Sequence, residues 1–328
     1  QRRPSLRLGV DAYAQKLEED AAKGQFRAHF DRAYAYDAAN DLPNAISEYT
    51  SAINVLPAHA LAWYNRGICR ERQGDAAAAL DDFTQAIQRA EASAREAYPL
   101  ADFYHNRAFC KRKLADFSGA VDDYSSALKR DSSHFKALYN RAFCLDALGR
   151  REDALRDYDA ALVVEPRHPS AHHNRGVVLE KLGRLEDAVE AFDNAVDCGM
   201  PPDAEYHHAR GTNARHRGDH AAAAASFSAA LKLDPHHRTA RANRAYARRK
   251  IGDFVGARRD YGKALADAPT AKLYNARAYC SAKLEKFDAA VADYTEALRL
   301  DPANAHALHN RGISYDRLGR DDEAARDF

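Results

Sequence analysis

A unit of about 34 residues recurs nine times along this chain, and this period limits the possible folds more than any other feature. Each unit contains an alanine, a Tyr or Phe four residues later, and a second alanine three residues after the ring. The first copy is Ala45, Tyr49 and Ala52. A fixed period in this range is typical of repeat proteins, in which one small unit stacks on the next. Function in such folds lies on an extended surface rather than in one enclosed pocket.

Each repeat is predicted to be a pair of short antiparallel helices, A and B. When the positions are numbered 1 to 34, with the first alanine of the pattern at 20, apolar residues fall at 4, 8 and 11 and again at 20, 24 and 27, which is the helical period. A turn signal such as Gln73-Gly74-Asp75 separates the two runs. The fold class is therefore all-α. The repeats begin at Phe26, Ala60, Ala101, Phe135, Pro169, Ala204, Arg238, Ala271 and Ala305.

The expected domain organisation is an N-terminal segment, 1–25, followed by the repeat array, 26–328, whose last copy is truncated. Residues 11–22 are expected to form one helix that caps the first repeat or ends a preceding one. Seven extra residues, Ala94 to Leu100, follow the second repeat and are expected to lengthen its B helix before Pro99. The chain starts at a glutamine and stops in mid-pattern, which suggests a segment of a longer protein.

The overall composition gives no support to a nucleic-acid-binding or membrane-spanning function. The net charge of +1 does not indicate nucleic acid as a partner, and no apolar run approaches the roughly 18 residues of a membrane span. Four of the five cysteines occupy one equivalent position, and equivalent positions in stacked repeats are too far apart for a disulfide. We interpret them as small buried side chains in a reducing compartment. They are Cys69, Cys110, Cys144 and Cys280.

These positions together resemble the tetratricopeptide repeat family. The resemblance rests on Gly or Ala at position 8, an aromatic ring at 24 and proline at 32 in five copies, and it covers residues 26–328. It implies a right-handed superhelical solenoid of stacked helix pairs. It also implies that the A helices line a concave groove, with positions 2, 5, 9, 12 and 13 facing into it.

An arginine at position 7 and an acid at position 23 form a second repeating pattern. In an antiparallel hairpin, the position numbers of two residues that face each other add up to a constant. The apolar positions 11 and 20, or 4 and 27, give a constant of 31. Positions 7 and 23 add up to 30, so they lie within one residue of facing each other. A planar guanidinium facing a carboxylate can pair through two hydrogen bonds, so a half-buried ion pair is expected in most repeats. Repeats five and six carry Ala191 and Ser226 instead of the acid, and Glu190 or Asp193 could serve there. The arginines are Arg32, Arg66, Arg107, Arg141, Arg175, Arg210, Arg244, Arg277 and Arg311, and the acids are Glu48, Asp82, Asp123, Asp157, Asp260, Asp293 and Asp327.

An aromatic and apolar stripe is predicted in the groove of the first half. If it is exposed, such a stripe with a polar rim marks a partner site. The alternative is that these side chains pack against the next A helix. The residues are Tyr34, Tyr64, Ile68, His105, Phe109, Tyr139, Phe143 and His173.

The second half of the groove is predicted to be basic. Between Arg238 and Lys263 there are nine basic residues and two acids, which gives 9 − 2 = +7. An acidic segment of a protein partner could dock there, with a solvated charged surface as the alternative. Arg210 is also a candidate to bind an outside anion, because its B helix contains no acid. The predicted binding residues of this half are Arg210, Arg215, Tyr246, Arg249, Lys250, Lys272 and Lys283.

The motifs of several other functions are missing from the sequence. The family's clamp for chaperone tails needs Lys at 5, Asn at 9 and Arg at 6, and no copy has them. Neighbouring histidines such as His172-His173 point about 100° apart on a helix and cannot share a metal ion. No Gly-rich phosphate loop, HExxH or Gly-x-Ser-x-Gly motif occurs. We therefore expect no catalytic, cofactor or metal site in this segment, and nucleic acid is not an expected partner.

The expected function is a non-enzymatic scaffold that holds an extended or helical partner segment, with apolar anchors and acidic residues, in its groove within a multiprotein assembly. The alternatives are the substrate-recruiting arm of a longer enzyme and a structural component of a ciliary or organelle-transport complex. The expected location is intracellular and cytoplasmic, with a cilium or flagellum as the alternative, and no membrane insertion is expected.

Overall fold

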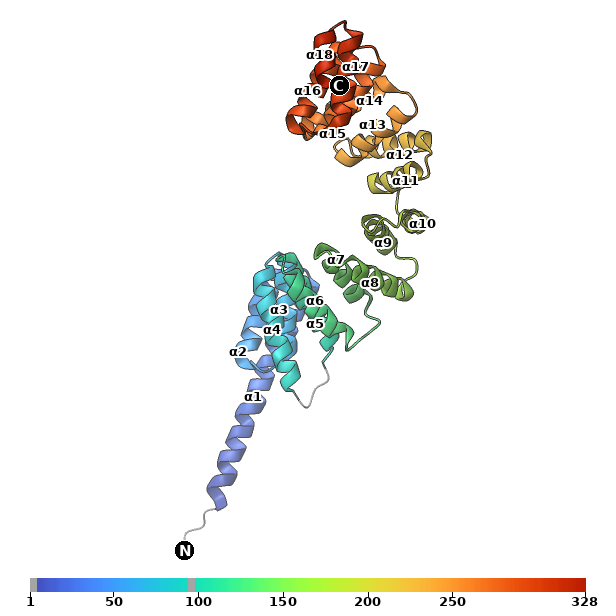
Figure 1. The fold of residues 1–328 in the computed structure, drawn as a ribbon. Coiled ribbons are helices and arrows are strands. Elements are labelled where there is room, and N and C mark those ends of the chain that lie inside the picture. Colours follow the sequence, from blue (N-terminus) through green and yellow to red (C-terminus); the bar gives the residue numbers. More distant parts are fainter. Residues whose placement is uncertain (1–4, 94–97) are drawn as a thin grey trace. The chain divides into compact units, whose positions relative to one another are not determined.

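The computed structural model describes residues 5–93 and 98–328, with side chains from residue 16 onward. These residues form eighteen helices and no strand, so the all-α prediction is confirmed (Figure 1). None of these helices is both long and apolar enough to cross a bilayer. The chain divides into two compact units, 1–171 and 172–328, and each is described by itself.

The first unit is a stack of antiparallel helix pairs (Figure 1). Its first helix is longer than expected, because the predicted helix over 11–22 and the first A helix are continuous, with no break near Phe26. The helix α9, Pro169–Lys181, contains the division between the units. The helices of the first unit are α1 Ser5–Ala38, α2 Leu42–Val55, α3 Ala60–Gln73, α4 Ala76–Ala92, α5 Leu100–Lys113, α6 Phe117–Leu128, α7 Phe135–Ala147 and α8 Arg151–Val164.

The second unit repeats the same arrangement. The A helices α11, α13, α15 and α17 each pack against their own B helix, and each B helix packs against the A helix that follows it. In addition, α11 contacts α13 and α15 contacts α17. The count of nine repeats is our interpretation of these pairs. The helices after α9 are α10 Leu185–Asp197, α11 Ala204–His216, α12 His220–Leu233, α13 Arg238–Lys250, α14 Phe254–Asp267, α15 Ala271–Lys283, α16 Phe287–Leu300, α17 Ala305–Arg317 and α18 Asp321–Asp327.

The turn between helices A and B follows from the Gly-Asp signal in the sequence. Gly74 ends α3 with φ +95°, a left-handed conformation that glycine adopts without steric cost. Asp75 then caps α4, because its carboxylate accepts a hydrogen bond from the Ala78 backbone N–H at 3.0 Å. This chemistry reverses the chain within two residues and sets the antiparallel packing of each pair.

The segment after α4 agrees in part with the expectation for the inserted residues. The α4 helix ends at Ala92 and has 17 residues, three more than α2 or α3. This B helix is therefore longer than its neighbours, but it ends before Ala94, and Leu100 of the insertion belongs to α5. Residues 94–97 of the predicted insertion lie outside the described residues.

The ring at position 24 is matched to the residue that faces it at position 8. A Cβ atom added to Gly67 would lie 2.8 Å from Phe83 Cε1, and one added to Gly211 would lie 2.8 Å from Phe227 Cδ1, so the phenylalanine rings touch the glycine backbone. Where position 8 is alanine, position 24 is tyrosine. The pairs with Phe are Gly67/Phe83, Gly176/Phe192, Gly211/Phe227 and Gly312/Phe328, and the pairs with Tyr are Ala33/Tyr49, Ala108/Tyr124, Ala142/Tyr158, Ala245/Tyr261 and Ala278/Tyr294.

This matching predicts a strong coupling between two substitutions in one repeat. In Gly67→Ala, the new methyl group would collide with the Phe83 ring, and overpacking of this kind costs about 1–3 kcal/mol. The better helix propensity of alanine offsets about 1 kcal/mol of that cost. Adding Phe83→Tyr restores the pair found in five other repeats and should recover the loss. In urea unfolding of the two single variants and the double variant, we expect a favourable coupling energy of about 1–2 kcal/mol. Simple additivity of the two changes would contradict the matching.

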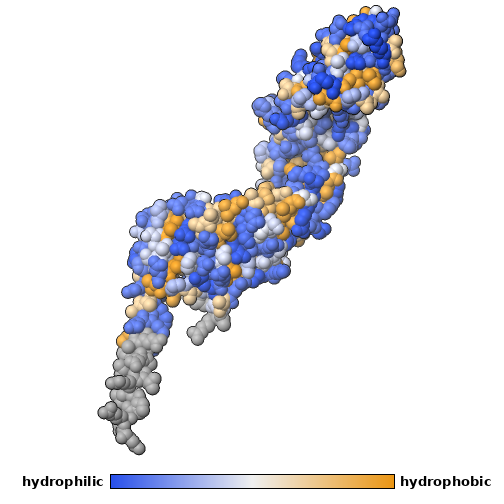
Figure 2. Space-filling view, turned by 60° about the vertical axis from the view of Figure 1, so that its left-hand side comes forward, coloured by the Kyte–Doolittle hydropathy of each residue, from blue (hydrophilic) through white to orange (hydrophobic). Residues whose placement is uncertain are grey.

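Most of the face drawn in Figure 2 is hydrophilic. On the face drawn in Figure 2, apolar residues form limited patches between larger hydrophilic areas. Four cysteines, Cys69, Cys110, Cys144 and Cys280, are fully buried and unpaired, as expected from their position.

Candidate functional site

The second unit contains a hollow of about 630 Å³ on its layer of A helices. Helices α11, α13, α15 and α17 supply nearly all of its lining, and Tyr261 at its floor comes from the B helix α14. We call this hollow the basic groove. Its polar and aromatic lining residues are Arg215, Asn243, Tyr246, Arg249, Tyr261, Lys272, Asn275, Tyr279, His306 and Asn310.

Arg249 lies at the centre of the basic groove between two tyrosine rings. Its guanidinium carbon is 5.3 Å from the ring centroid of Tyr246 and 5.3 Å from that of Tyr279. Cations over aromatic faces at this distance are attracted by the ring quadrupole. The Nε atom of Arg249 is buried and has no hydrogen-bond partner. Burial raises the pKa of the Tyr261 hydroxyl to about 12, although nearby Arg249 opposes this shift. The rings therefore orient the guanidinium and leave one of its donors unused.

Four further cations lie in or beside the basic groove. Lys250 Nζ is 5.7 Å from the Tyr246 ring, and Lys283 Nζ is 5.6 Å from the Tyr279 ring. Lys283 lines a hollow of about 400 Å³ that shares Tyr279 and Asn310 with the basic groove, while Arg215 and Lys272 line the groove itself. The structure thus brings together six of the predicted residues of the second half: Arg215, Tyr246, Arg249, Lys250, Lys272 and Lys283.

These cations are not neutralised as their counterparts in the first unit are. There, a base at position 13 pairs with an acid at position 12 of the preceding repeat, as Lys113 does with Glu71 at 2.5 Å and Arg72 does with Asp37. In the second unit the residues at position 12 before Lys250 and Lys283 are Arg215 and Arg249. With the side chains of residues 16–93 and 98–328, Arg215, Arg249, Lys250, Lys272 and Lys283 form no ion pair. The groove therefore carries uncompensated positive charge.

The prediction that position 5 faces into the groove is corrected for four residues. Tyr64 is stacked on Phe103 with ring centroids 4.3 Å apart, and its hydroxyl accepts a hydrogen bond from Asn106 Nδ2 at 2.6 Å. Tyr139 packs on Phe135, Tyr158 and His168. Tyr64 therefore packs against the next A helix, which was the alternative, whereas Tyr139 packs within its own hairpin and on the turn before the next A helix. The corrected residues are Tyr64, His105, Tyr139 and His173.

The two histidines of this set lie in opposite electrostatic environments. His105 is 8% exposed, and burial lowers its pKa to about 4, with a further lowering by His134, whose ring stacks on it. His173 Nε2 lies 2.8 Å from an Asp203 carboxylate oxygen, and this hydrogen bond raises its pKa. Both rings also contact the ring at position 24 of their own hairpin, which shows that they belong to the core.

Position 9 in the first unit is more open than position 5. Tyr34 is 64% exposed and Phe143 is 41% exposed, whereas Ile68 and Phe109 are half-buried. These four residues remain candidates for apolar contacts with a partner. The sequence analysis missed Arg112, whose guanidinium lies 4.8 Å from the Phe109 ring and 5.3 Å from the Phe143 ring. Its place at position 12, the same as that of Arg249, was the available signal.

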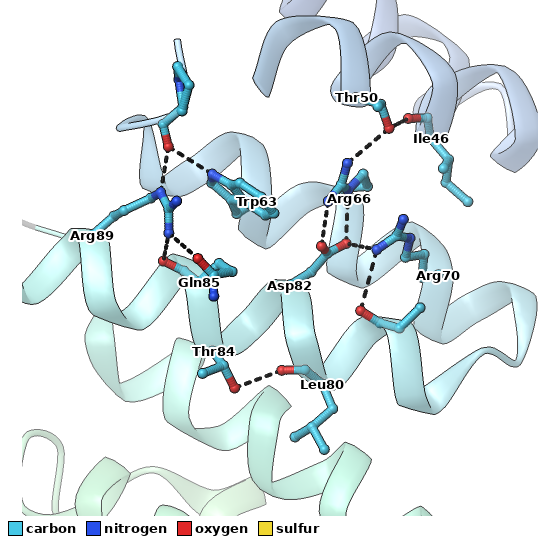
Figure 3. Close-up of polar contacts among 12 residues, drawn as sticks. Ile46, Thr50, Trp63, Arg66, Arg70, Leu80, Asp82, Thr84, Gln85 and Arg89 are labelled. Carbon is cyan, nitrogen blue, oxygen red and sulfur yellow. Dashed lines mark hydrogen bonds and ion pairs between the residues drawn. The ribbon is translucent and has the colours of Figure 1, made fainter. Parts of the chain in front are cut away.

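The predicted ion pairs form in all seven repeats that have both partners. Figure 3 shows the pair in the second repeat, where Asp82 accepts hydrogen bonds from Arg66 Nε at 3.0 Å, Arg66 Nη2 at 2.7 Å and Arg70 Nη1 at 2.9 Å. Asp82 is 1% exposed, so its charge is satisfied entirely by these arginines. The other pairs are Arg32–Glu48, Arg107–Asp123, Arg141–Asp157, Arg244–Asp260, Arg277–Asp293 and Arg311–Asp327.

A hydroxyl at position 25 links this pair to the preceding repeat, and the sequence analysis did not identify it. Arg66 Nη1 donates to Thr50 Oγ1 at 3.0 Å, and Thr50 itself donates to the Ile46 carbonyl (Figure 3). The same bond joins Arg141 to Ser125 and Arg311 to Thr295. The arginine therefore fixes the stacking of repeats as well as the register within a hairpin.

Glu205, His208 and His237 are the one cluster among the described residues close enough to suggest a metal site, with one candidate ligand atom from each lying within 4.8 Å of the others. However, His237 Nδ1 accepts a hydrogen bond from the Ala240 backbone N–H at 3.3 Å and so caps α13. The proton of a neutral ring must then be on Nε2, which lies 3.6 Å from Glu205. A metal on Nε2 would force the proton onto Nδ1 and remove this cap.

The comparisons with known proteins identify the family. The family model described as tetratricopeptide repeat matches residues 30–97, 145–203 and 208–272, which is more than half of the chain, and a second model, TPR repeat, matches 276–319. The chain therefore belongs to the tetratricopeptide repeat family. No catalytic family is indicated, and the extended surface of a repeat fold serves to bind other proteins.

Curated relatives match only a part of the chain. Sperm-associated antigen 1 of Mus musculus is 38% identical over 77 residues, which are 24% of this chain and 8% of that protein. Tetratricopeptide repeat protein 36 of Homo sapiens is 33% identical over 97 residues, which are 28% of this chain and 51% of that protein.

Solved structures show the same fold at low sequence identity. A tetratricopeptide repeat protein from Parabacteroides merdae is 20% identical, with a TM-score of 0.51 over 78% of this chain and 98% of that chain. The pilF protein of Pseudomonas aeruginosa is 14% identical, with a TM-score of 0.52 over 66% and 95% of the two chains.

Proposed function

We propose that this protein is a non-enzymatic scaffold whose basic groove binds an acidic segment of a protein partner and holds it within a multiprotein assembly. The observation that carries the proposal is the uncompensated charge of Arg215, Arg249, Lys250, Lys272 and Lys283 around two tyrosine rings. Charge complementarity of this kind gives specificity and speeds association.

The tyrosines and asparagines of the groove complete the binding chemistry. Arg249 is held between Tyr246 and Tyr279, so less side-chain freedom is lost when a carboxylate reaches it. The rings also offer apolar faces to aliphatic groups of the partner. Asn243, Asn275 and Asn310 line the same hollow, and their amides can donate to and accept from a peptide backbone. The expected ligand is therefore an extended or helical segment in which acidic residues alternate with apolar anchors.

The location proposed with this function is intracellular. The five cysteines are unpaired, and four of them are buried, which suits a reducing compartment. A cilium or flagellum remains the alternative location, and one relative is named for its association with sperm, sperm-associated antigen 1.

The charge-reversal variant Arg249→Glu/Lys250→Glu tests the proposal. The probe is an array of 12-residue peptides in which the numbers of acidic and of apolar residues vary independently. We expect the wild-type chain to prefer peptides that combine both, and the variant to lose at least tenfold in affinity, because two attractive contacts become repulsive. Affinities are measured by fluorescence anisotropy at about 50 and 200 mM salt, and the wild-type binding should weaken as salt rises.

A matched control separates the groove from a general charge effect. Arg259→Glu/Lys263→Glu makes the same change in net charge at two exposed residues of α14 that do not line the groove. It should bind the peptides within about twofold of the wild type. Equal losses in both variants, or binding that does not respond to salt, would refute the proposed role of the groove.

A further inference from the structure

Repeat six lacks the carboxylate that its ladder arginine would pair with. Position 23 is Ser226, and the whole B helix α12, His220–Leu233, contains no acid. In the seven repeats that have both partners, a carboxylate takes that place, with Arg–carboxylate distances such as 2.7 Å for Arg244 and Asp260. Repeat six therefore has the arginine of the pair on its A helix but no acid on its B helix.

The guanidinium of Arg210 is correspondingly open to solvent. Its side chain is 51% exposed, compared with 18% for Arg244 in the next repeat. Arg210 Nη1 donates to the Tyr206 hydroxyl at 2.6 Å, which is a neutral partner on its own helix. Among the residues the structure describes, the only acid within 4 Å of its side-chain nitrogens is Asp193 of the preceding repeat, at 3.9 Å and 48% exposed. This distance leaves the arginine without the two-pronged partner that its equivalents have.

A hollow of about 240 Å³ lies beside Arg210, apart from the basic groove. Arg217 and Asn213 also line it and add donors, and Arg217 forms no ion pair with any other residue that the structure describes. Asp219 lines it too, but its carboxylate caps α12 by accepting from the Ala222 backbone N–H at 2.9 Å. Ser226, which occupies the position of the missing acid, lines the hollow as well. The hollow thus has two arginines in its lining and a serine at the position where other repeats carry a carboxylate.

We propose that this hollow binds an oxyanion, either a carboxylate or a phosphoryl group of a ligand, which takes the place of the missing ladder carboxylate on Arg210. The site is distinct from the basic groove and does not depend on the function proposed for it. The same guanidinium geometry that binds a carboxylate in seven other repeats selects planar or tetrahedral oxyanions over chloride.

The test is a titration with inorganic phosphate at pH 7.5, followed by NMR of the arginine Nε–Hε groups. Ionic strength is held constant with sodium chloride, and the Arg210 signal is assigned by its loss in Arg210→Gln. We expect a saturable shift of this signal in the wild type. In Ser226→Asp, which rebuilds the ladder pair, the apparent affinity should fall at least tenfold. Ala225→Asp adds the same charge at an exposed neighbouring residue of α12 and should bind phosphate nearly as the wild type does.

Each outcome decides the proposal. A shift that rises linearly and equally in all variants would mean an adventitious ion only and would overturn it. A saturable shift that is unchanged in Ser226→Asp would also overturn it, because the anion would then lie elsewhere. A parallel titration with acetate distinguishes the two sources of the oxyanion: saturation with both points to a carboxylate ligand, and saturation with phosphate alone points to a phosphoryl group.

Discussion

Asp82→Ala is expected to lower the free energy of unfolding of the first unit by about 3–5 kcal/mol, the usual cost of removing one partner of a buried ion pair. Asp82 accepts three hydrogen bonds from Arg66 and Arg70, and Arg66 is itself only 7% exposed. Without the carboxylate, the buried guanidinium of Arg66 keeps only Thr50 as a hydrogen-bond partner and the Trp63 ring as a cation–π contact, and it must hold its charge away from water. The large effect comes from this orphaned cation, since an intact buried pair contributes little net stability by itself.

Urea unfolding followed by circular dichroism measures this effect, with Asp81→Ala as the control. Asp81 is the exposed neighbour on the same helix, so its loss removes an equal charge but no buried pair. Its effect should stay within about 0.5 kcal/mol. A second variant, Arg66→Met/Asp82→Leu, removes both charges and should recover much of the loss. If Asp82→Ala and Asp81→Ala destabilise the protein equally, the ladder pair is not the cause.

Acidification from pH 7.5 to pH 5 is expected to destabilise the first unit by about 2 kcal/mol through His105 alone. The folded pKa of His105, about 4, lies below its usual value of 6.5. Its contribution to stability is therefore complete above pH 6.5 and is lost as the pH falls from 6.5 towards 4, because the unfolded chain takes up the proton first. The ring contacts His134, Tyr124, Asn106 and Asn140, none of which is a carboxylate. Among the nearby charges, Lys136 lowers the pKa of His105 and Asp102 raises it, but burial is the largest cause and the net shift is downward.

His105→Tyr isolates this effect, because tyrosine occupies the same repeat position at Tyr64 and Tyr139. The free energy of unfolding is measured at pH 7.5 and at pH 5 for both proteins, and the variant should lack about 2 kcal/mol of the wild-type acid loss. His173 works in the opposite direction, since its raised pKa makes its contribution complete at low pH and lost as the pH rises. It is unchanged in the variant, so it cancels in the comparison. The same acid loss in both proteins would contradict the role of His105.

The ion-pair ladder could be predicted from the sequence because the period and the antiparallel register together place positions 7 and 23 opposite each other. Arg141 and Asp157, for example, are 16 residues apart and meet at 2.6 Å. The fold class followed from the same regularity. The bond from Arg141 to Ser125 could not be predicted in this way, because it crosses between repeats and depends on how one hairpin stacks on another.

The aromatic stripe shows what periodicity cannot decide. Tyr64 at position 5 and Tyr246 at position 9 lie on neighbouring rows of an A helix, and the helical period does not say which row the next repeat covers. The structure covers the first, since Tyr64 stacks on Phe103, and leaves the second beside a hollow, since Tyr246 lines the basic groove. Charge was the better guide to the groove. Solvation keeps unpaired cations such as Lys250 and Lys272 at the surface, whereas aromatic side chains are stable in either place.

The matching of position 8 with position 24 has a consequence for how arrays of this kind can change by recombination. A crossover between two hairpins keeps every glycine with its phenylalanine and every alanine with its tyrosine. A crossover in the turn within a hairpin would join, for instance, the first helix of the fourth repeat, with Ala142, to the second helix of the fifth, with Phe192, although Gly176 is the native partner of that ring. The unit that can be duplicated or exchanged is therefore the whole helix pair. Exchanges whose joints lie between two hairpins should be tolerated, and exchanges whose joints lie in the turn within a hairpin should destabilise the fold.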